Sequence, residues 1–470
     1  PGGVMPSGPD GLVSDPHYTY EFARARSLLL SHPQRWQVIY HYDGDGIASA
    51  SSALRALSRL GYPAQATALV GVERSHVSAL LETTPGPVLV VDTGSTVLDL
   101  FAAHRAPVVV LDHHKYPGAP TPPTLPDHVA LVNPLDWGVD GMSELCAATL
   151  TWLYTIFLDP VNWDNAPWGL SGAIADRQHV GGFKGLNALL VDEAVRRSLV
   201  IARPGVALFG PTVAEALAAS IDPFVRGLSG RPEAVGPFLN DLGVDPSRSP
   251  SKLTADENRR LVAALKERLT KAGVVPEAAN VLDQERWSLP SLGLDAEEVS
   301  NLQNAAGRAG TPGVGVAYAL GDPRAAERVK AAEREWRTGI LRGLLRVEND
   351  GVNSMRFLRW FESPETTLAG TQAGLAMNYL LPPDHPVFVF SEGGRGPTKV
   401  SARGLLRQVD RGLDLAAVCR VAAASVGGEG GGHRVASGAT IPPGTRPAFL
   451  DAADKVLSEQ LATPEGGSGP

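Results

Sequence analysis

The sequence predicts an α/β fold, with a parallel-sheet domain that carries a helical insertion and a smaller mixed α/β domain after it. Short apolar runs alternate with helical stretches between about residues 36 and 135, which is typical of a parallel sheet covered on both faces. Helix-forming stretches dominate from about 190 to 300, and strand-like runs return after 349. A chain of 470 residues is also too long for a single ordinary core.

The first domain is predicted from five strand-like runs and the helices between them. After the first run, apolar residues recur with the spacing of one helix face, at Ile47, Ala50, Leu54 and Leu57. We place this domain at residues 16–323, with the mainly helical insertion at 190–300, which contains helix-forming stretches such as Asp256–Ala272. The predicted strands are Trp36–Tyr40, Ala66–Val70, Pro87–Val91, Pro107–Leu111 and Val129–Val132.

A long charged linker helix is predicted at 324–348. Its apolar stripe, which would pack against one domain, is Val329, Trp336, Ile340 and Leu344. The second domain follows at 349–455, with strands at Pro386–Phe390 and Thr398–Ser401 and a helix at Leu413–Ala424. We expect a disordered tail at 1–15 and a further tail at 456–470.

Composition limits the classes of function. No run of about 18 apolar residues occurs, so no membrane span is expected, and the first residues lack the blocks of a secretory signal. Cys146 and Cys419 are the only cysteines, which excludes a disulfide scaffold or a cysteine zinc site and fits a cytoplasmic protein. The net charge of −8 argues against broad coating of nucleic acid but allows a local basic groove.

Carboxylates and imidazoles follow three of the predicted strands. Because parallel sheets place their sites at the carboxyl edge, these groups are expected to form one site for hard divalent cations. The groups are His41, Asp43 and Asp45 after the first strand, Asp92 after the third, and Asp112, His113 and His114 after the fourth.

Each of these groups has a second interpretation. The Asp43–Gly46 segment could be a solvated turn with Asp45 as a helix N-cap, and Asp92 could cap the segment after it. Asp112–His114 could be an exposed loop end with two unrelated histidines. Adjacent histidines point to opposite sides of an extended chain, so one would bind metal and the other would face substrate unless the backbone turns.

Further candidates lie downstream. Asp176 ends another small apolar run. The glycine-rich stretch 427–432 is either a flexible linker or a loop whose N–H groups wrap an anion, and His433 and Arg434 follow it with donors suited to phosphate.

The ordered set Asp-x-Asp-Gly, strand-end Asp, Asp-His-His, Ala-Asp-Arg-Gln and, much later, Gly-Gly-Gly-His resembles the DHH phosphoesterase superfamily with its DHH-associated carboxyl-terminal domain. Asn304–Arg308 and Ser401–Arg403 also resemble the RecJ branch, and the length and helical middle are most similar to archaeal-type RecJ proteins. The resemblance covers about residues 36 to 445 and implies an active-site cleft between the two domains.

The resemblance also implies a site with two Mn²⁺ ions, or Mg²⁺ in their place. Asp92 would be shared between the ions, His114 would lie near the scissile phosphate, and Asp112 would support the histidines. The metal ligands would be Asp43, Asp45, Asp92, His113 and Asp176, with His41 as a ligand in some branches. The phosphate contacts would be Arg308, Ser401, Arg403, Gly431, Gly432, His433 and Arg434.

These features lead to three hypotheses. The first is a 5′–3′ exonuclease on single-stranded DNA or RNA that uses two Mn²⁺ ions to activate water, acts in DNA repair and has a replication or repair protein as a possible partner. The second is a phosphoesterase for short substrates such as nanoRNA or linear dinucleotides, which the acidic net charge and the lack of an OB-fold after His433 favour. The third is a non-catalytic replication scaffold, against which the presence of every motif acid argues.

Overall fold

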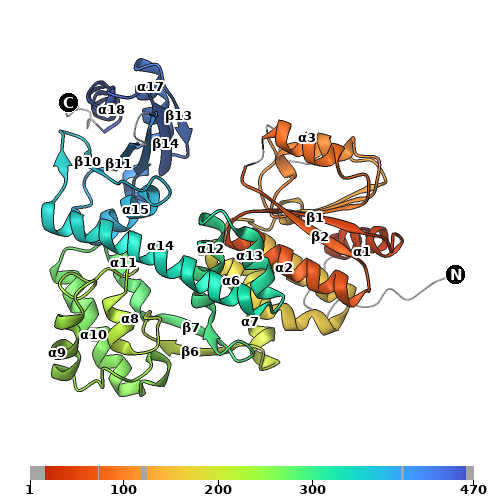
Figure 1. Ribbon diagram of the computed structural model, residues 1–470, viewed down its shortest axis with the longest axis horizontal. Coiled ribbons are helices and arrows are strands. Elements are labelled where there is room, and N and C mark those ends of the chain that lie inside the picture. The colour runs from red at the N-terminus through yellow and green to blue at the C-terminus, as the bar shows by residue number, and fades with distance from the viewer. Residues whose placement is uncertain (1–15, 72, 118–123, 393–395, 462–470) are drawn as a thin grey trace, which may run out of the picture. The chain divides into compact units, whose positions relative to one another are not determined.

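A computed structural model describes residues 16–71, 73–117, 124–392 and 396–461. The predicted tail at 1–15 lies outside these residues. The chain divides into two compact units, the first made of 1–204 and 285–334 and the second of 205–284 and 335–470 (Figure 1). In the part of the chain that the structure describes, no helix has both the length and the apolar composition that crossing a membrane requires.

The first unit contains a five-stranded sheet in the order β2-β1-β3-β4-β5, and every pair in it is parallel. The predicted parallel sheet is therefore confirmed. The three strands β3, β4 and β5 are buried along their whole length, which explains why they read as continuous apolar runs. The strands are β1 (Trp36–His41), β2 (Ala64–Leu69), β3 (Val88–Val91), β4 (Val108–Leu111) and β5 (Val129–Val132).

Helices cover both faces of this sheet. Alternate residues of each strand pack on opposite sides, so that Val38 and Leu89 belong to one core and Ile39 and Val90 to the other. The first core includes α1 (Pro16–Leu30), α2 (Gly44–Arg59) and α5 (Ala147–Leu158), and the second includes α3 (Arg74–Glu82) and α4 (Leu98–Ala102). Around α2 and α5 pack α6 (Ala166–Ala175), α7 (Gly185–Arg196), α12 (Ala296–Arg308) and α13 (Pro312–Ala319).

The order of the strands reverses between β1 and β3. β2 lies on one side of β1, whereas β3, β4 and β5 lie on the other. In open α/β sheets, ligands bind outside the carboxyl ends of the strands at this switch point. His41 ends β1 and Asp92 follows β3, so the fold brings two of the predicted site residues to that position.

A small sheet, with strand order β6-β7-β8, was missed in the region predicted to be mainly helical. Its strands are β6 (Ile201–Gly205), β7 (Gln284–Leu289) and β8 (Leu294–Asp295). Their sequences mix apolar, charged and proline residues, so no strand period is visible. Pairing is instead supported by side chains far apart in sequence, because Arg203 bonds both Ser288 and Asp295.

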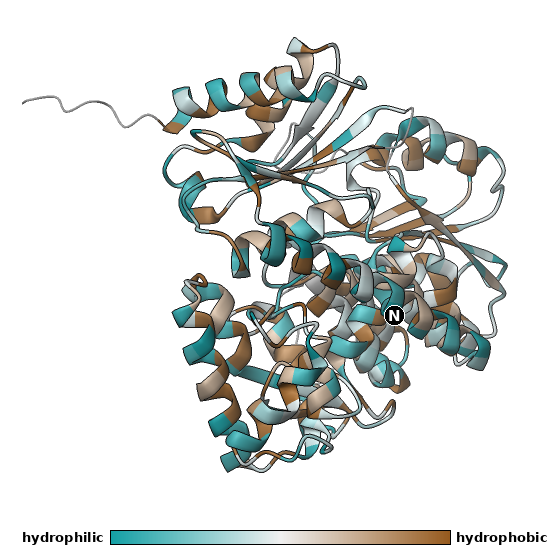
Figure 2. Cartoon of the chain, turned by 60° about the vertical axis from the view of Figure 1, so that its left-hand side comes forward, coloured by the Kyte–Doolittle hydropathy of each residue, from teal (hydrophilic) through white to brown (hydrophobic). Residues whose placement is uncertain are grey.

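The helices of the predicted insertion belong mostly to the second unit rather than to the sheet domain. They pack in one core with the second half of α14 (Pro323–Asp350) and with α15 (Ala369–Tyr379), because buried Leu261 and Leu265 share that core with Ile340 and Leu344. These helices are α8 (Val213–Ala218), α9 (Pro232–Asp241), α10 (Ala255–Lys271) and α11 (Pro276–Ala279). Coloured by hydropathy, helices of the chain carry hydrophobic residues on one face and hydrophilic residues on another (Figure 2).

The second unit also contains a mixed sheet in the order β13-β14-β12-β11-β10-β9. The glycine-rich stretch predicted as a loop forms the edge strand β13, and α18 continues to Leu461, beyond the expected start of the tail at 456. The strands are β9 (Asn353–Ser354), β10 (Arg359–Glu362), β11 (Val387–Glu392), β12 (Thr398–Arg403), β13 (Glu429–Gly432) and β14 (Ala436–Ile441). The remaining helices are α16 (Leu406–Val409), α17 (Leu415–Ser425) and α18 (Arg446–Leu461).

Candidate metal centre

The turn after β1 is shaped by a glycine that no other residue can replace without movement. A Cβ on Gly46 would lie 2.0 Å from the carbonyl oxygen of His41. This close approach lets α2 start immediately after β1, with Asp43 as its N-cap accepting a hydrogen bond from the Gly46 N–H at 3.1 Å. Asp45, which we considered as the cap, lies instead in the first turn of the helix and is free to point elsewhere.

Asp45 is buried and is held by the start of another helix. Its two carboxylate oxygens accept hydrogen bonds from the N–H groups of Ala147 at 3.0 Å and Ala148 at 2.8 Å, the first residues of α5. The positive end of the helix dipole favours a carboxylate here. Burial nevertheless raises the pKa of Asp45 well above its usual value, and repulsion from Asp92 and Asp176 adds to this effect.

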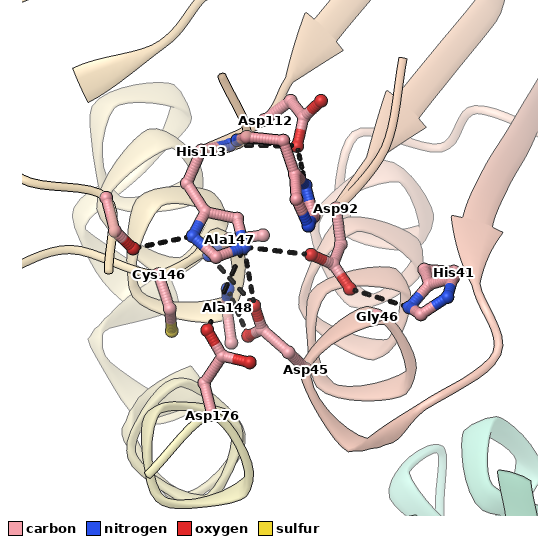
Figure 3. A network of polar contacts seen from close by, with 12 residues as sticks. His41, Asp45, Gly46, Asp92, Asp112, His113, Cys146, Ala147, Ala148 and Asp176 are labelled. Atoms are coloured by element: carbon pink, nitrogen blue, oxygen red, sulfur yellow. Dashed lines mark hydrogen bonds and ion pairs between the residues drawn. The ribbon is translucent and has the colours of Figure 1, made fainter. Parts of the chain in front are cut away.

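His113 lies among three carboxylates (Figure 3). Its Nε2 atom is 3.3 Å from Asp92 Oδ1, 3.7 Å from Asp45 Oδ2 and 3.8 Å from Asp176 Oδ2. Its Nδ1 atom is 2.7 Å from the carbonyl oxygen of Gly141, which can only accept, so Nδ1 carries the proton. In the neutral ring, Nε2 then presents a lone pair toward the carboxylates, as a metal-binding histidine requires.

Asp92 lies between two groups of possible ligand atoms. Its Oδ2 atom is 3.6 Å from Nδ1 of His41, which in turn is 3.0 Å from Asp43. Its Oδ1 atom faces His113, as described above (Figure 3). Asp45, His113 and Asp176 therefore form one group, and His41, Asp43 and Asp92 form the other, with all ligand atoms of each group within 4.8 Å of one another. Asp92, His113 and His114 meet the same criterion and connect the two groups.

The backbone and the burial of Asp92 are both unusual. Its φ angle of +59° is in the left-handed region, which few residues other than glycine adopt. The side chain is 2% exposed, and its Oδ2 atom has no hydrogen-bond partner within the described residues. A buried carboxylate oxygen without a partner is costly unless a cation satisfies it.

These residues fit a divalent cation. Burial raises the pKa of Asp176 to about 6, and repulsion from Asp92 and Asp43 contributes, whereas the charge of His113 acts in the opposite direction. Burial alone would lower the pKa of His41, but the neighbouring carboxylates of Asp43 and Asp92 raise it to about 11. Carboxylate oxygens with one or two imidazoles suit Mn²⁺, and Mg²⁺ with less affinity for the nitrogen ligands.

Asp112 faces the neighbouring backbone rather than these two groups. It is fully buried and accepts hydrogen bonds from the N–H groups of Ser95 at 2.8 Å and His113 at 2.8 Å, and from Nδ1 of His114 at 2.8 Å. The ring of His114 lies 4.4 Å from that of His113, and its side chain is 46% exposed. Asp112 thus fixes both histidines, while His114 is open to a ligand.

The predicted phosphate contacts of the second unit share one sheet face. Ser401 pairs with Gly438, which pairs with Gly431, and Arg403 lies two residues after Ser401 on the same face. A Cβ on Gly431 would have no neighbour within 4 Å, so this part of the face is open. Gly432 points to the other face, and exposed His433 and Arg434 follow at the end of β13.

Comparison with known proteins identifies both units. The sequence model of the DHH family, N-terminal domain, matches residues 36–170, and that of the DHHA1 domain matches residues 369–459. The chain belongs to the DHH phosphoesterase superfamily. Members of this superfamily are metal-dependent hydrolases, and the ligand groups described above are of the kind that such a hydrolase requires.

Similarity to known proteins extends along nearly the whole chain. The uncharacterized protein MJ0831 of Methanocaldococcus jannaschii is 26% identical over 446 residues, 93% of this chain and 96% of that protein. A manganese-bound crystal structure of exonuclease RecJ is 18% identical, with 97% of this chain and 99% of that chain covered and a TM-score of 0.60. CDC45 from Entamoeba histolytica is 10% identical, with coverage of 94% and 98% and a TM-score of 0.63. At these identities, the two solved structures show the fold alone.

A chain of buried hydrogen bonds behind the DHH centre was not predicted. Gln178 Nε2 donates to the Gly141 carbonyl oxygen at 2.8 Å, the same oxygen that bonds His113. Asn187 Nδ2 donates to Gln178 Oε1 at 2.6 Å, and Thr149 Oγ1 donates to Asn187 Oδ1 at 2.6 Å. Gln178 was visible only as a neighbour of Asp176, and nothing in the sequence marks Asn187 or Thr149.

The predicted Arg308 lies beside the centre of the DHH domain. It is the last residue of α12, and Asp43 attracts its guanidinium. Two other residues of α12 fix this helix against the turn after β1. Asn304 Oδ1 accepts a hydrogen bond from the Gly44 N–H at 3.1 Å, and a Cβ on Gly307 would lie 2.2 Å from the Tyr42 carbonyl oxygen.

Proposed function

We propose that this protein is a 5′–3′ exonuclease that hydrolyses phosphodiester bonds of single-stranded DNA or RNA with two Mn²⁺ ions. One observation carries the proposal. Asp92 is a buried carboxylate in a left-handed backbone conformation, one oxygen of which faces His113 while the other faces His41 without a hydrogen-bond partner. This is the arrangement expected of a residue shared by two ions.

The residues that would hold the ions follow from the two ligand groups. Asp45, His113 and Asp176 would hold one, and His41 and Asp43 would hold the other, with Asp92 common to both. When bound, the two ions supply Lewis acidity, which lowers the pKa of water and offsets charge on a phosphodiester.

His114 is the residue of the chain best placed to contribute a proton. Burial alone would lower its pKa, but the hydrogen bond and the charge of Asp112 raise it overall. Because Nδ1 is bonded to Asp112, the proton available to a substrate is on Nε2 of the partly exposed ring. We assign His114 Nε2–H as a donor to a phosphate oxygen or to the leaving oxygen.

The sheet face that carries Ser401, Arg403 and Gly431, which is open at Gly431, supports a nucleotide substrate. Arg403 supplies a planar cation suited to phosphate, and its guanidinium passes within 2.5 Å of the place where a Cβ on Gly370 would be. Gly431 has no side chain to keep a sugar-phosphate backbone away. We assign Ser401, Arg403 and the Gly431–Arg434 segment to binding the nucleic-acid strand or its 5′ phosphate. We also propose a replication or repair protein as a possible partner.

A second candidate is hydrolysis of short substrates such as nanoRNA or linear dinucleotides, which the net charge of −8 favours. Strands of 5 and 30 nucleotides, labelled at either end and offered as DNA and RNA with Mn²⁺, distinguish the two. The exonuclease releases mononucleotides from the 5′ end of the 30-mer, and excess EDTA stops the reaction. Cleavage of the 5-mer alone would establish the second candidate, and cleavage of neither strand would reject the first.

A further inference from the structure

An open cavity of about 600 Å³ lies at the turn between α12 and α13 and the first turns of α14, entirely within the first unit. It is lined by short side chains and backbone on one side and by the start of α14 on the other. Gly310 and Gly313 allow a ligand to approach the backbone of the turn closely. The lining includes Gly310, Gly313, Asp322, Arg324 and Arg328.

The charge of this cavity is positive. Arg324 and Arg328 are exposed and lie four residues apart on α14, hence on one face of the helix. Over residues 16–71, 73–117, 124–392 and 396–461, no carboxylate forms an ion pair with either guanidinium. The carboxylate in the lining, Asp322, accepts a hydrogen bond from the backbone N–H of Arg324 at 2.8 Å instead.

The cavity lies close to the metal centre along the chain, because it follows directly after α12, which is held against α2. Gly310 comes two residues after Arg308, whose guanidinium Asp43 attracts, and two residues span at most about 7 Å. The hydrogen bond from Gly44 to Asn304 and the packing of Gly307 on Tyr42 hold this helix against α2. α12 and α13 lie beside α2, with which both are in contact (Figure 1).

We propose that the cavity is a phosphate subsite for the strand beyond the scissile nucleotide, with Arg324 and Arg328 binding backbone phosphates. The proposal rests on the proposed function, because it requires a polynucleotide to be held at the metal centre. Arginine suits this role since its planar guanidinium can donate two hydrogen bonds to one phosphate. The site would favour strands long enough to leave the centre and reach α14, and would give no advantage to a dinucleotide.

The test compares two double variants that remove the same charge. Arg324→Gln/Arg328→Gln changes the cavity. Arg35→Gln/Arg105→Gln changes two exposed arginines just before β1 and β4, at the opposite edge of the same sheet from the centre. Binding of a fluorescent 12-nucleotide strand is measured by anisotropy in EDTA between 50 and 200 mM NaCl, and kcat/KM in Mn²⁺ is measured for a 12-mer and a dinucleotide.

Each phosphate contact contributes about 0.7 to the slope of log affinity against log salt for single strands. The cavity variant should therefore show a slope about 1.4 shallower than the wild type, and a lower ratio of kcat/KM for the 12-mer to that for the dinucleotide. The proposal is wrong if the cavity variant binds as the wild type does, if the control variant loses as much slope, or if the wild type binds no strand. Strand binding that depends on the cavity, without hydrolysis of either substrate, would instead reject the proposed function and leave the subsite established.

Discussion

Removal of one charge from the metal centre should make the metal-free protein more stable. Burial, together with the repulsion of Asp92 and Asp43, raises the pKa of Asp176 from 3.8 to about 6, although the charge of His113 opposes the rise. A carboxylate with this pKa prefers to be protonated in the fold, so its ionisation at pH 7 destabilises the folded state relative to the unfolded chain. Asp176→Asn removes the charge and keeps a side chain of the same size.

The magnitude follows from the two pKa values. Each pKa unit corresponds to 1.36 kcal/mol, so ionisation of Asp176 destabilises the metal-free fold by about 3 kcal/mol at pH 7. This is the upper limit of the gain in the variant, since the asparagine amide has a desolvation cost of its own. For a domain of this size each kcal/mol changes Tm by about 2–4 °C, so we expect a rise of several degrees.

The sign of the pH dependence is fixed by the same values. The folded-state pKa is raised, so the wild type loses stability as the pH rises from about 3.8 to about 6. The gain in the free energy of unfolding of Asp176→Asn over the wild type should therefore be complete above pH 6 and absent below pH 3.8. Thermal unfolding in EDTA across this range measures it, with Asp127→Asn as a control because Asp127 is exposed and lies just before β5, at the opposite edge of the sheet from the centre.

With Mn²⁺ present the order should reverse, because the wild type gains binding energy that the variant lacks. An EDTA-treated Asp176→Asn variant that melts below the wild type at pH 7 would refute this reasoning. So would an advantage that is the same at pH 4 and pH 7, since a change in packing alone has no reason to follow the titration of Asp176.

Three further predictions concern the centre and the second unit. Asp92→Asn should abolish Mn²⁺-dependent hydrolysis while circular dichroism and Tm remain those of a folded protein, and retained activity would contradict its role as the shared ligand. Asn187→Leu removes the donor to Gln178 and should weaken Mn²⁺ binding about 10- to 100-fold in calorimetry, whereas unchanged affinity would show that the buried chain has no effect on His113. Gly430→Ala should lower Tm, because its Cβ would lie 2.4 Å from the Cys419 carbonyl oxygen. Gly431→Ala should fold normally but bind oligonucleotides more weakly, since a Cβ there meets no other atom of the protein. Equal behaviour of the two variants would contradict the assignment of an open face at Gly431.

The sheet of the first unit was predictable because its strands are buried on both faces. Runs such as Val88–Val91 and Val108–Leu111 have no polar residue, and each is followed at once by acids or histidines. The small sheet could not be found in this way, since β6 and β7 are separated by almost 80 residues and both carry charges. The helices of the insertion belong mostly to the second unit because their apolar faces pack against its helices. The periodicity of a helix shows which of its faces is apolar, but not which helix packs against that face.

The metal-ligand residues were predictable because they directly follow the apolar strands. The hydrogen bonds that hold these ligand side chains in place were not predictable. The sequence left open whether Asp43 or Asp45 begins the helix, and the structure assigns the cap to Asp43 because Gly46 brings its own N–H within reach. Asp45 then turns toward the start of α5, about a hundred residues away in sequence. Contacts of this kind arise only after helices have packed, and no local pattern encodes them.

The supports of the centre suggest how metal binding and folding are related. The N–H groups of α5 hold Asp45, Asp112 holds the backbone of His113, and the Gly141 carbonyl holds its ring. None of these bonds involves a metal, so the arrangement of the ligands does not need an ion to form. What opposes the metal-free state is the proximity of like charges, not disorder of the chain. We therefore expect Mn²⁺ to raise Tm without changing secondary structure, unlike small zinc domains that unfold without their metal.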